Sequence, residues 1–152
     1  MNDFTNLIKN AKEQYNKVII VNEDKSEKYK AYCKEHNIPI HNLSVKIAEL
    51  LKKVPEGERD QETADKLREW FYQMDDNVIA FDNLDYLFSD EVGKINPIQF
   101  FNYKTRKKGA VVILFIRAKR RNNLLIYSEE GKPDYMEIDI SSNEGFVEGW
   151  QQ

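Results

Sequence analysis

The chain has 152 residues, of which 41% are apolar and 32% are charged, as is ordinary for a soluble globular protein. This length favours one domain with a real hydrophobic core. The single cysteine, Cys33, excludes an internal disulfide bond, and the sequence has no signal peptide and no apolar run long enough to span a membrane. We therefore expect a cytoplasmic protein without membrane attachment.

The amino-terminal half of the chain predicts helices that alternate with short strands. Apolar residues at helical spacing indicate an amphipathic helix over residues 3–15, and the continuous apolar run 18–21 indicates a strand buried on both faces. The other elements expected here are a short strand within 37–44 and helices capped by Asp24 or Ser26, by Ser44 and by Asp60.

The carboxyl-terminal half contains the most β-prone segments. Residues 77–83, NVIAFDN, predict a third strand, and residues 110–116, AVVILFI, predict a fourth strand at the centre of the sheet. Asn96 and Pro97 mark the start of a helix between them, because proline loses no needed N–H group at the first helical position.

These elements predict an α/β fold in three layers, with a mainly parallel sheet of about five strands and helices on both faces. Segments 123–128 and 134–140 add a C-terminal hairpin. We expect residues 1–140 to form a single domain and residues 141–152 to form a C-terminal tail. Ligands of such sheets bind beyond the carboxyl ends of the strands, so one shared edge is expected for the loops after Val21, Phe81 and Ile116.

The segment VIIVNEDKSEKYK at residues 18–30 has the strand–loop–helix layout of a P-loop, the element that cradles nucleotide phosphates. Against the pattern G-x-x-x-x-G-K-[ST], Asn22 and Glu27 replace both glycines, Tyr29 replaces the hydroxyl residue, and only Lys28 is kept. Glycines let backbone N–H groups curl around a phosphate, and the carboxylates in this loop would repel one. We therefore favour a capped strand–helix connection with a solvated Lys28 over an ordinary ATP site.

A second nucleotide motif is suggested by VIAFDNLD, residues 78–85. An acid at the end of an apolar strand matches a Walker B segment, in which Asp82 would hold Mg²⁺ directly or through water. Hydrolytic versions carry a second acid next, but this chain has Asn83, which cannot act as a general base. Asp85 lies two residues further on as a candidate substitute, and the alternative is that Asp82 only caps a turn.

Two segments carry a resemblance to a known family: residues 78–116 (VIAFDNLDYLFSDEVGKINPIQFFNYKTRKKGAVVILFI) and residues 123–135 (NLLIYSEEGKPDY). The chain resembles the BrxF family, the small P-loop proteins of type 3 BREX phage-defence systems, over roughly residues 15–140. The resemblance implies an AAA+/RecA-like P-loop NTPase fold, nucleotide binding through a glycine-rich loop, and action beside other BREX proteins. Because the glycines are missing here, only Lys28 and Asp82 are carried over as nucleotide or Mg²⁺ contacts.

Basic residues are concentrated in one part of the chain, since residues 92–128 contain nine Lys or Arg and no Asp or Glu. Two clusters flank the predicted fourth strand and would lie at its opposite ends. They are candidates for binding nucleic-acid phosphate or an acidic protein surface, and the alternative is a solvated basic loop. The candidates are Lys104, Arg106, Lys107 and Lys108 before the strand, and Arg117, Lys119, Arg120 and Arg121 after it.

No catalytic residue is assigned, because the sequence suggests no arrangement of nucleophile, base and oxyanion donor. His36 and His41 lack partners at metal-ligand spacing. Three functions remain open. The first is an assembly or regulatory module of a BREX system that needs no cofactor. The second is a slow ATP switch in which Lys28, Asp82 and Asp85 hold Mg-ATP, completed by a neighbouring subunit. The third is a nucleic-acid-binding accessory protein. Other BREX proteins, a larger ATPase and DNA are the partners considered.

Overall fold

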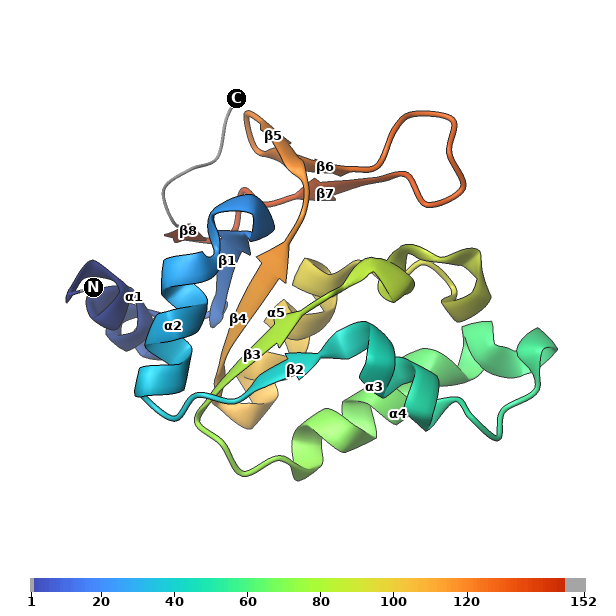
Figure 1. The fold of residues 1–152 in the computed structure, drawn as a ribbon, viewed down its shortest axis with the longest axis horizontal. Coiled ribbons are helices and arrows are strands. Elements are labelled where there is room, and N and C mark those ends of the chain that lie inside the picture. The colour runs from blue at the N-terminus through green and yellow to red at the C-terminus, as the bar shows by residue number, and fades with distance from the viewer. Residues whose placement is uncertain (1, 147–152) are drawn as a thin grey trace.

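The computed structural model of the protein describes residues 2–146, and its core is a five-stranded parallel sheet (Figure 1). The strands lie in the order β2-β3-β4-β1-β8, and all four neighbouring pairs are parallel. The prediction of an α/β fold with a mainly parallel sheet is therefore confirmed, and the fourth strand lies at its centre as expected. The strands are β1 (Val18–Asn22), β2 (Ile40–Asn42), β3 (Val78–Asp82), β4 (Val111–Ile116) and β8 (Gly145–Phe146).

Helices cover both faces of this sheet. Side chains along β1 alternate between two buried clusters: Ile19 and Val21 pack with one pair of helices, whereas Val18 and Ile20 pack with the other three. This alternation follows from the pleat of a strand, which points successive side chains to opposite faces. One face carries α1 (Asn2–Glu13) and α2 (Glu27–Glu35), and the other carries α3 (Leu43–Leu50), α4 (Arg59–Gln73) and α5 (Pro97–Lys108).

The predicted capping residues agree with the structure only in part. At α2, Ser26 occupies the cap position, but its side chain makes no capping hydrogen bond. Asn96 caps α5 as predicted, because its side-chain oxygen accepts two N–H groups of the first turn, each at 3.1 Å. At α3, Asn42 and not Ser44 is the cap, and its Oδ1 accepts the N–H of Val45 at 3.0 Å. α4 begins two residues earlier than a cap at Asp60 predicts, so Asp60 lies within its first turn.

A separate antiparallel sheet is inserted between β4 and β8. Its strands β6 and β7 form the predicted hairpin, whereas β5 was not expected because its sequence is almost entirely basic. Figure 1 shows this sheet beyond the end of β4, with the loop between β6 and β7 projecting away. The three strands are β5 (Lys119–Arg121), β6 (Leu124–Tyr127) and β7 (Met136–Asp139).

The sheet extends past the boundary predicted at residue 140. Gly145 and Phe146 pair with Ile19 and Ile20 of β1, so the expected 141–152 tail begins with residues that belong to the fold. A strand of two residues has no periodicity, which is why the sequence pattern did not reveal it. Residues 147–152 of that expected tail lie outside the described part of the chain.

Candidate functional site

A cavity lies at the carboxyl edge of the sheet, where β1, β3 and β4 end. Its volume is about 260 Å³. After β1 the chain crosses towards β2, and after β4 it crosses towards β8, so the cavity lies at the switch point where ligands of parallel sheets bind. The lining residues are Glu23, Asp82, Asn83, Leu84, Asp85, Phe88, Phe115, Ile116, Arg117 and Tyr127.

The loop after β1 is a single 3-10 turn, Glu23–Lys25, and not a phosphate cradle. The N–H of Asp24 donates to Asn22 Oδ1 at 3.1 Å, and the N–H of Ser26 donates to the Glu23 carbonyl at 3.3 Å. The positive φ angles of the described chain all occur outside residues 22–29. A ring of outward-pointing amides needs such angles, so this loop does not present one.

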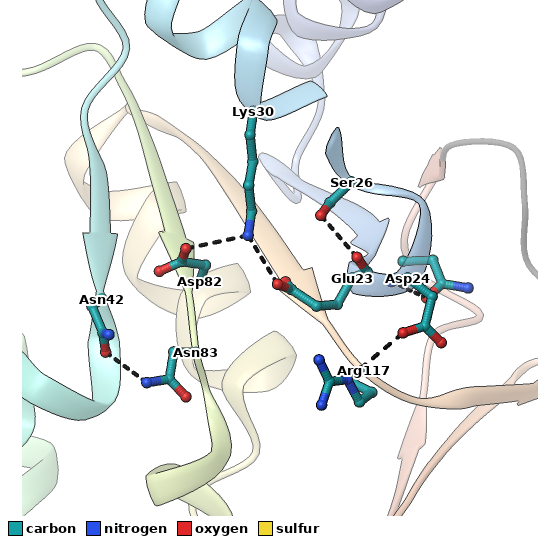
Figure 2. Close-up of polar contacts among 9 residues, drawn as sticks. Glu23, Asp24, Ser26, Lys30, Asn42, Asp82, Asn83 and Arg117 are labelled. Atoms are coloured by element: carbon teal, nitrogen blue, oxygen red, sulfur yellow. Dashed lines mark hydrogen bonds and ion pairs between the residues drawn. The ribbon is translucent and has the colours of Figure 1, made fainter. Parts of the chain in front are cut away.

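Lys30 of α2 bridges two carboxylates that line the cavity (Figure 2). Its Nζ lies 2.9 Å from Glu23 Oε1 and 3.3 Å from Asp82 Oδ2. All three side chains are about three-quarters buried, with exposed fractions of 26%, 21% and 25%. Burial by itself lowers the pKa of Lys30, but the hydrogen bonds and charges of Glu23 and Asp82 outweigh it, so that pKa is raised. The ammonium therefore stays charged at neutral pH.

The lysine that matched the P-loop pattern lies elsewhere. Lys28 is exposed, its Nζ is 5.2 Å from the centre of the Tyr29 ring, and it does not line the cavity. α2 begins at Glu27, so Lys28 projects from its first turn, while Lys30 lies about 200° further around the helix. The pattern assumes a long glycine-rich loop, and the short 3-10 turn moves the inward-facing lysine two residues along.

Asp82 ends β3, Asn83 follows it, and the two side chains face different partners. Asp82 points to Lys30, as described above. Asn83 adopts a left-handed backbone with φ 51°, and its Nδ2 donates to Asn42 Oδ1 at 2.9 Å. The Asn83 carbonyl also accepts the Ser44 hydroxyl at 2.6 Å. Asn83 thus joins the ends of β2 and β3, and asparagine is among the residues that tolerate this backbone conformation best.

Asp85 connects the cavity to the antiparallel sheet. Its Oδ1 accepts the Tyr127 hydroxyl at 2.8 Å, and the Tyr127 ring stacks on Phe88 with 3.7 Å between ring centroids. Burial, followed by the hydrogen bond to Asp85, raises the pKa of Tyr127 well above its usual value. A further contact holds this sheet, because Lys94 Nζ donates to the Tyr135 carbonyl at 2.8 Å. Asp85 is therefore engaged in holding β6.

The predicted basic residues are divided between the two ends of β4. Arg117 lines the cavity together with Asp82 and Asp85, although its side chain is 70% exposed and its Nε lies 3.7 Å from Asp24 Oδ1. The remaining residues after β4 lead away from the site on β5, and those before β4 lie near the opposite edge of the sheet. These two groups are Lys119, Arg120 and Arg121, and Arg106, Lys107 and Lys108.

Sequence reasoning brought Asp82, Asp85 and Arg117 to one edge but missed four residues that shape it. Glu23, Lys30, Phe88 and Tyr127 lie within the quoted segments, but the motifs give none of them a role. For Lys30 and Glu23 a usable signal existed, since a lysine one turn into the helix after an acidic loop is placed to pair with it. Tyr127 gave no local signal, because its partner Asp85 is 42 residues away.

The arrangement of the possible metal ligands bears on whether Mg²⁺ can bind. Within residues 2–146, no group of three or more His, Cys, Asp and Glu side chains is arranged to hold a metal ion. The carboxylate expected to meet Mg²⁺, Asp82, already has a cation beside it in Lys30. The cavity is also smaller than the roughly 300–1,000 Å³ typical of small-molecule sites. The residues present do not fit an ordinary Mg-ATP site.

Comparison with known proteins gave no match: no family model, no curated protein and no solved structure is significantly similar to this chain. Among the described helices, none has both the length and the apolar character needed to cross a membrane.

Proposed function

We propose that this chain is a BrxF-like assembly or regulatory module of a type 3 BREX phage-defence system, with a P-loop-like fold whose nucleotide site has degenerated. The proposal starts from the resemblance of residues 78–116 and 123–135 to that family. It is supported by topology, because the loop after β1 and Asp82 after β3 meet at one edge on either side of β4. A P-loop and a Walker B acid can contact the same nucleotide only when they lie at the same edge of the sheet.

The observation that carries the proposal is the ion pairing of Lys30 with Glu23 and Asp82. A bound Mg²⁺ would have to displace the ammonium from Asp82, and a phosphate would approach the carboxylate of Glu23. Removing one partner of a mostly buried ion pair leaves a poorly solvated charge, which is costly. Three carboxylates also oppose two cations around the cavity, counting Asp85 and Arg117. The site is therefore complete without a nucleotide.

This module acts through contacts with other proteins of the system and not through catalysis. The two residues that follow Asp82 as candidates for the base of ATP hydrolysis are both engaged, because Asn83 bridges β2 and β3 and Asp85 holds Tyr127. The partners are other BREX proteins, with a larger ATPase as one candidate. Such a role requires the fold and its surfaces but no turnover.

Calorimetric titration with Mg-ATP tests the nucleotide side of this proposal. We expect no binding in the micromolar range for the wild-type chain, and no change for Lys28→Ala or Asp82→Ala. Lys25→Ala, at an exposed position of the same loop, is the matched charge control. Micromolar binding by the wild type that disappears in both Lys28→Ala and Asp82→Ala, but not in Lys25→Ala, would overturn the proposal.

The biological side is tested by phage challenge of cells that carry a type 3 BREX system with this chain. Deleting the chain should abolish restriction, whereas Lys28→Ala and Asp82→Ala should keep it, because no nucleotide step depends on them. Loss of restriction in these two variants, at normal protein abundance, would contradict the assembly role.

A slow ATP switch is the second candidate, and Arg117 is the observation that favours it. Its guanidinium lies at the cavity, is largely exposed, and approaches its nearest acidic partner only to 3.7 Å. An arginine so placed is available to a phosphate. In this reading Lys28 and Asp82 contact the nucleotide and Lys30 turns away from Asp82, so the calorimetric result that overturns the first proposal would support this one.

A further inference from the structure

The opposite edge of the sheet carries an exposed surface that the fold does not explain. Tyr15 and Tyr103 are the two most exposed large apolar side chains of the described residues, at 74% and 60%. Tyr15 follows α1, and Tyr103 lies on α5. Aromatic rings are usually kept from water because they bury a large apolar area, so two exposed rings in one region point to a binding role.

Arg106 contacts the Tyr15 ring and lies on the same side of α5 as Tyr103. Its guanidinium carbon lies 4.0 Å from the centre of the Tyr15 ring, and it is three residues after Tyr103, on the neighbouring turn of α5. Asn16 Oδ1 fixes the arginine by accepting from Nε at 2.9 Å and from Nη2 at 2.5 Å. Asn16 is itself buried, and its amide donates to the Ser142 carbonyl at 2.9 Å. The guanidinium is therefore held rigidly against the ring.

Two lysines lie near Tyr103 on α5. Lys104 Nζ lies 4.8 Å from the centre of the Tyr103 ring, and Lys107 is exposed one turn further along α5. Burial lowers the pKa of Lys104, and the nearby charges of Arg68 and Lys107 lower it further, against a smaller opposing effect of Asp65. Positive charges therefore gather closely enough on this part of the surface to repel each other.

We propose that this face binds single-stranded nucleic acid through Tyr15, Tyr103, Lys104, Arg106 and Lys107, which we call the amino-edge surface. Proteins that bind single strands combine aromatic side chains, on which bases stack, with cations that meet the phosphates. Arginine planes also stack with bases. The proposal is independent of the nucleotide cavity and of the assembly role.

Helix capping does not account for this surface. Basic residues in the last turn of a helix often only stabilise its negative end. Lys108 fits that description of a structural role, since its ammonium donates to the carbonyls of Met74 and Tyr72. Capping gives no reason, however, for exposing Tyr15 and Tyr103 or for stacking Arg106 on a ring.

The amino-edge surface is also distinct from the basic residues beyond β4. The six residues of β4 separate the two by roughly 20 Å. The cluster on β5, Lys119–Arg121, has no exposed aromatic side chain of the kind seen here among the described residues. This second cluster provides a charge-matched control within the same molecule.

Fluorescence anisotropy with a labelled oligothymidine strand at low salt tests the proposal. Tyr103→Ala and Tyr15→Ala should each weaken binding about tenfold, whereas Tyr103→Phe should bind like the wild type because it keeps the ring. Lys107→Ala should reduce the slope of log affinity against log salt by roughly 0.7, the value for one phosphate contact on a single strand. Lys119→Ala removes the same charge at the other end of β4 and should have little effect.

Each alternative outcome would overturn the inference. These outcomes are no association at low salt, equal losses in Lys107→Ala and Lys119→Ala, full binding by Tyr15→Ala and Tyr103→Ala, or tighter binding of the same sequence as a duplex. Oligouridine in place of oligothymidine distinguishes RNA from DNA as the ligand, and binding of either by the tyrosines supports the surface. Circular dichroism of each variant confirms that it is folded before its affinity is used.

Discussion

His41 is a half-buried titratable residue of β2. It lies on β2 edge-on to Trp70, with 5.3 Å between ring centroids, and 5.9 Å from Phe81. Its Nε2 is buried and has no hydrogen-bond partner within the described chain. Burial lowers the pKa of His41, Asp76 opposes this, and Lys46 adds to it. The folded protein therefore favours the neutral imidazole.

This environment predicts a loss of stability in mild acid. Because the pKa of His41 is lower in the folded than in the unfolded state, its contribution is complete above the unfolded value of about 6.5 and is lost as the pH falls towards the folded value. His41→Phe keeps a ring of similar size and removes the proton site, so its free energy of unfolding should vary less over that range. Urea denaturation at a series of pH values measures this.

The control for this experiment is His36→Gln, because His36 is exposed and stacks on Tyr32 at the end of α2. It should leave the pH dependence of the wild type in place. If His41→Phe and the wild type lose stability in parallel, the His41 imidazole is not the group that titrates.

Lys28 and Lys30 show that a residue pattern can locate the edge of the sheet where a site lies without identifying the lysine that faces it. The apolar strand and the acid after it located the site edge, and Asp82 and Asp85 do line the cavity. The identity of the inward lysine depended on the turn that precedes α2, and turn geometry is set by hydrogen bonds such as that from Asp24 to Asn22. A motif with fixed spacing does not contain that information.

At the level of elements, β8 is a two-residue strand that depends on a close approach of two backbones. A Cβ atom on Gly145 would lie 3.1 Å from the Val18 carbonyl oxygen and 3.2 Å from Ile19 Cγ1. Such contacts are tight, and the backbone partner cannot turn away as a flexible side chain can. An alanine here would have to push the two backbones apart by a few tenths of an ångström.

Gly145→Ala should accordingly move β8 away from β1 and lower the free energy of unfolding by about 1 kcal/mol or more. Gly57→Ala is the matched control, because a Cβ atom at Gly57 would meet nothing within 4 Å. Thermal or urea unfolding of the two variants measures the difference. Equal stabilities of Gly145→Ala and Gly57→Ala would show that β8 does not constrain the sheet.

Element boundaries were predictable where the signal is local. Asn96 and Pro97 gave the start of α5 because capping and the fixed φ of proline act within one turn. The cap of α3 was assigned to Ser44, but Ser44 is taken up by the Asn83 carbonyl across the sheet, and Asn42 caps the helix. Serine is a common helix cap, but here the hydrogen bond from Ser44 to the distant Asn83 carbonyl takes its hydroxyl instead.

At the scale of the molecule, residues 141–146 make hydrogen bonds with distant parts of the chain. Asn143 and Asn102 are both buried and exchange two side-chain hydrogen bonds, at 2.9 and 2.8 Å. Asn16 also depends on this segment through its bond to the Ser142 carbonyl. Leaving one buried amide without its partner costs roughly 1–3 kcal/mol.

A chain that ends at residue 140 should therefore be markedly less stable than the full chain, by at least about 2 kcal/mol from the orphaned amides and the lost β8 pairing. Asn143→Ala in the full chain isolates the amide contribution and should lie between the two. Denaturation midpoints in urea measure all three. A shortened chain with the midpoint of the full chain would restore residue 140 as the true domain boundary.

The sequence pattern was sufficient to predict the parallel sheet, but not the position of the antiparallel sheet beside it. Apolar runs such as 78–81 and 110–116 are long enough to identify buried strands, and alternation with helices implies a parallel sheet. The position of the antiparallel sheet depends on Tyr127 meeting Asp85 and on Lys94 meeting Tyr135, contacts between distant segments that leave no periodic signal.

Asp85 has a consequence for communication within the molecule, because it belongs to the cavity and to the antiparallel sheet at once. A ligand that takes Oδ1 of Asp85 competes with the Tyr127 hydroxyl, and a protein that pulls the β6–β7 hairpin outward frees that oxygen. By thermodynamic reciprocity, each event changes the free energy of the other by the same amount. Occupancy of the cavity would then change the mobility of the β6–β7 hairpin, which a partner protein can detect.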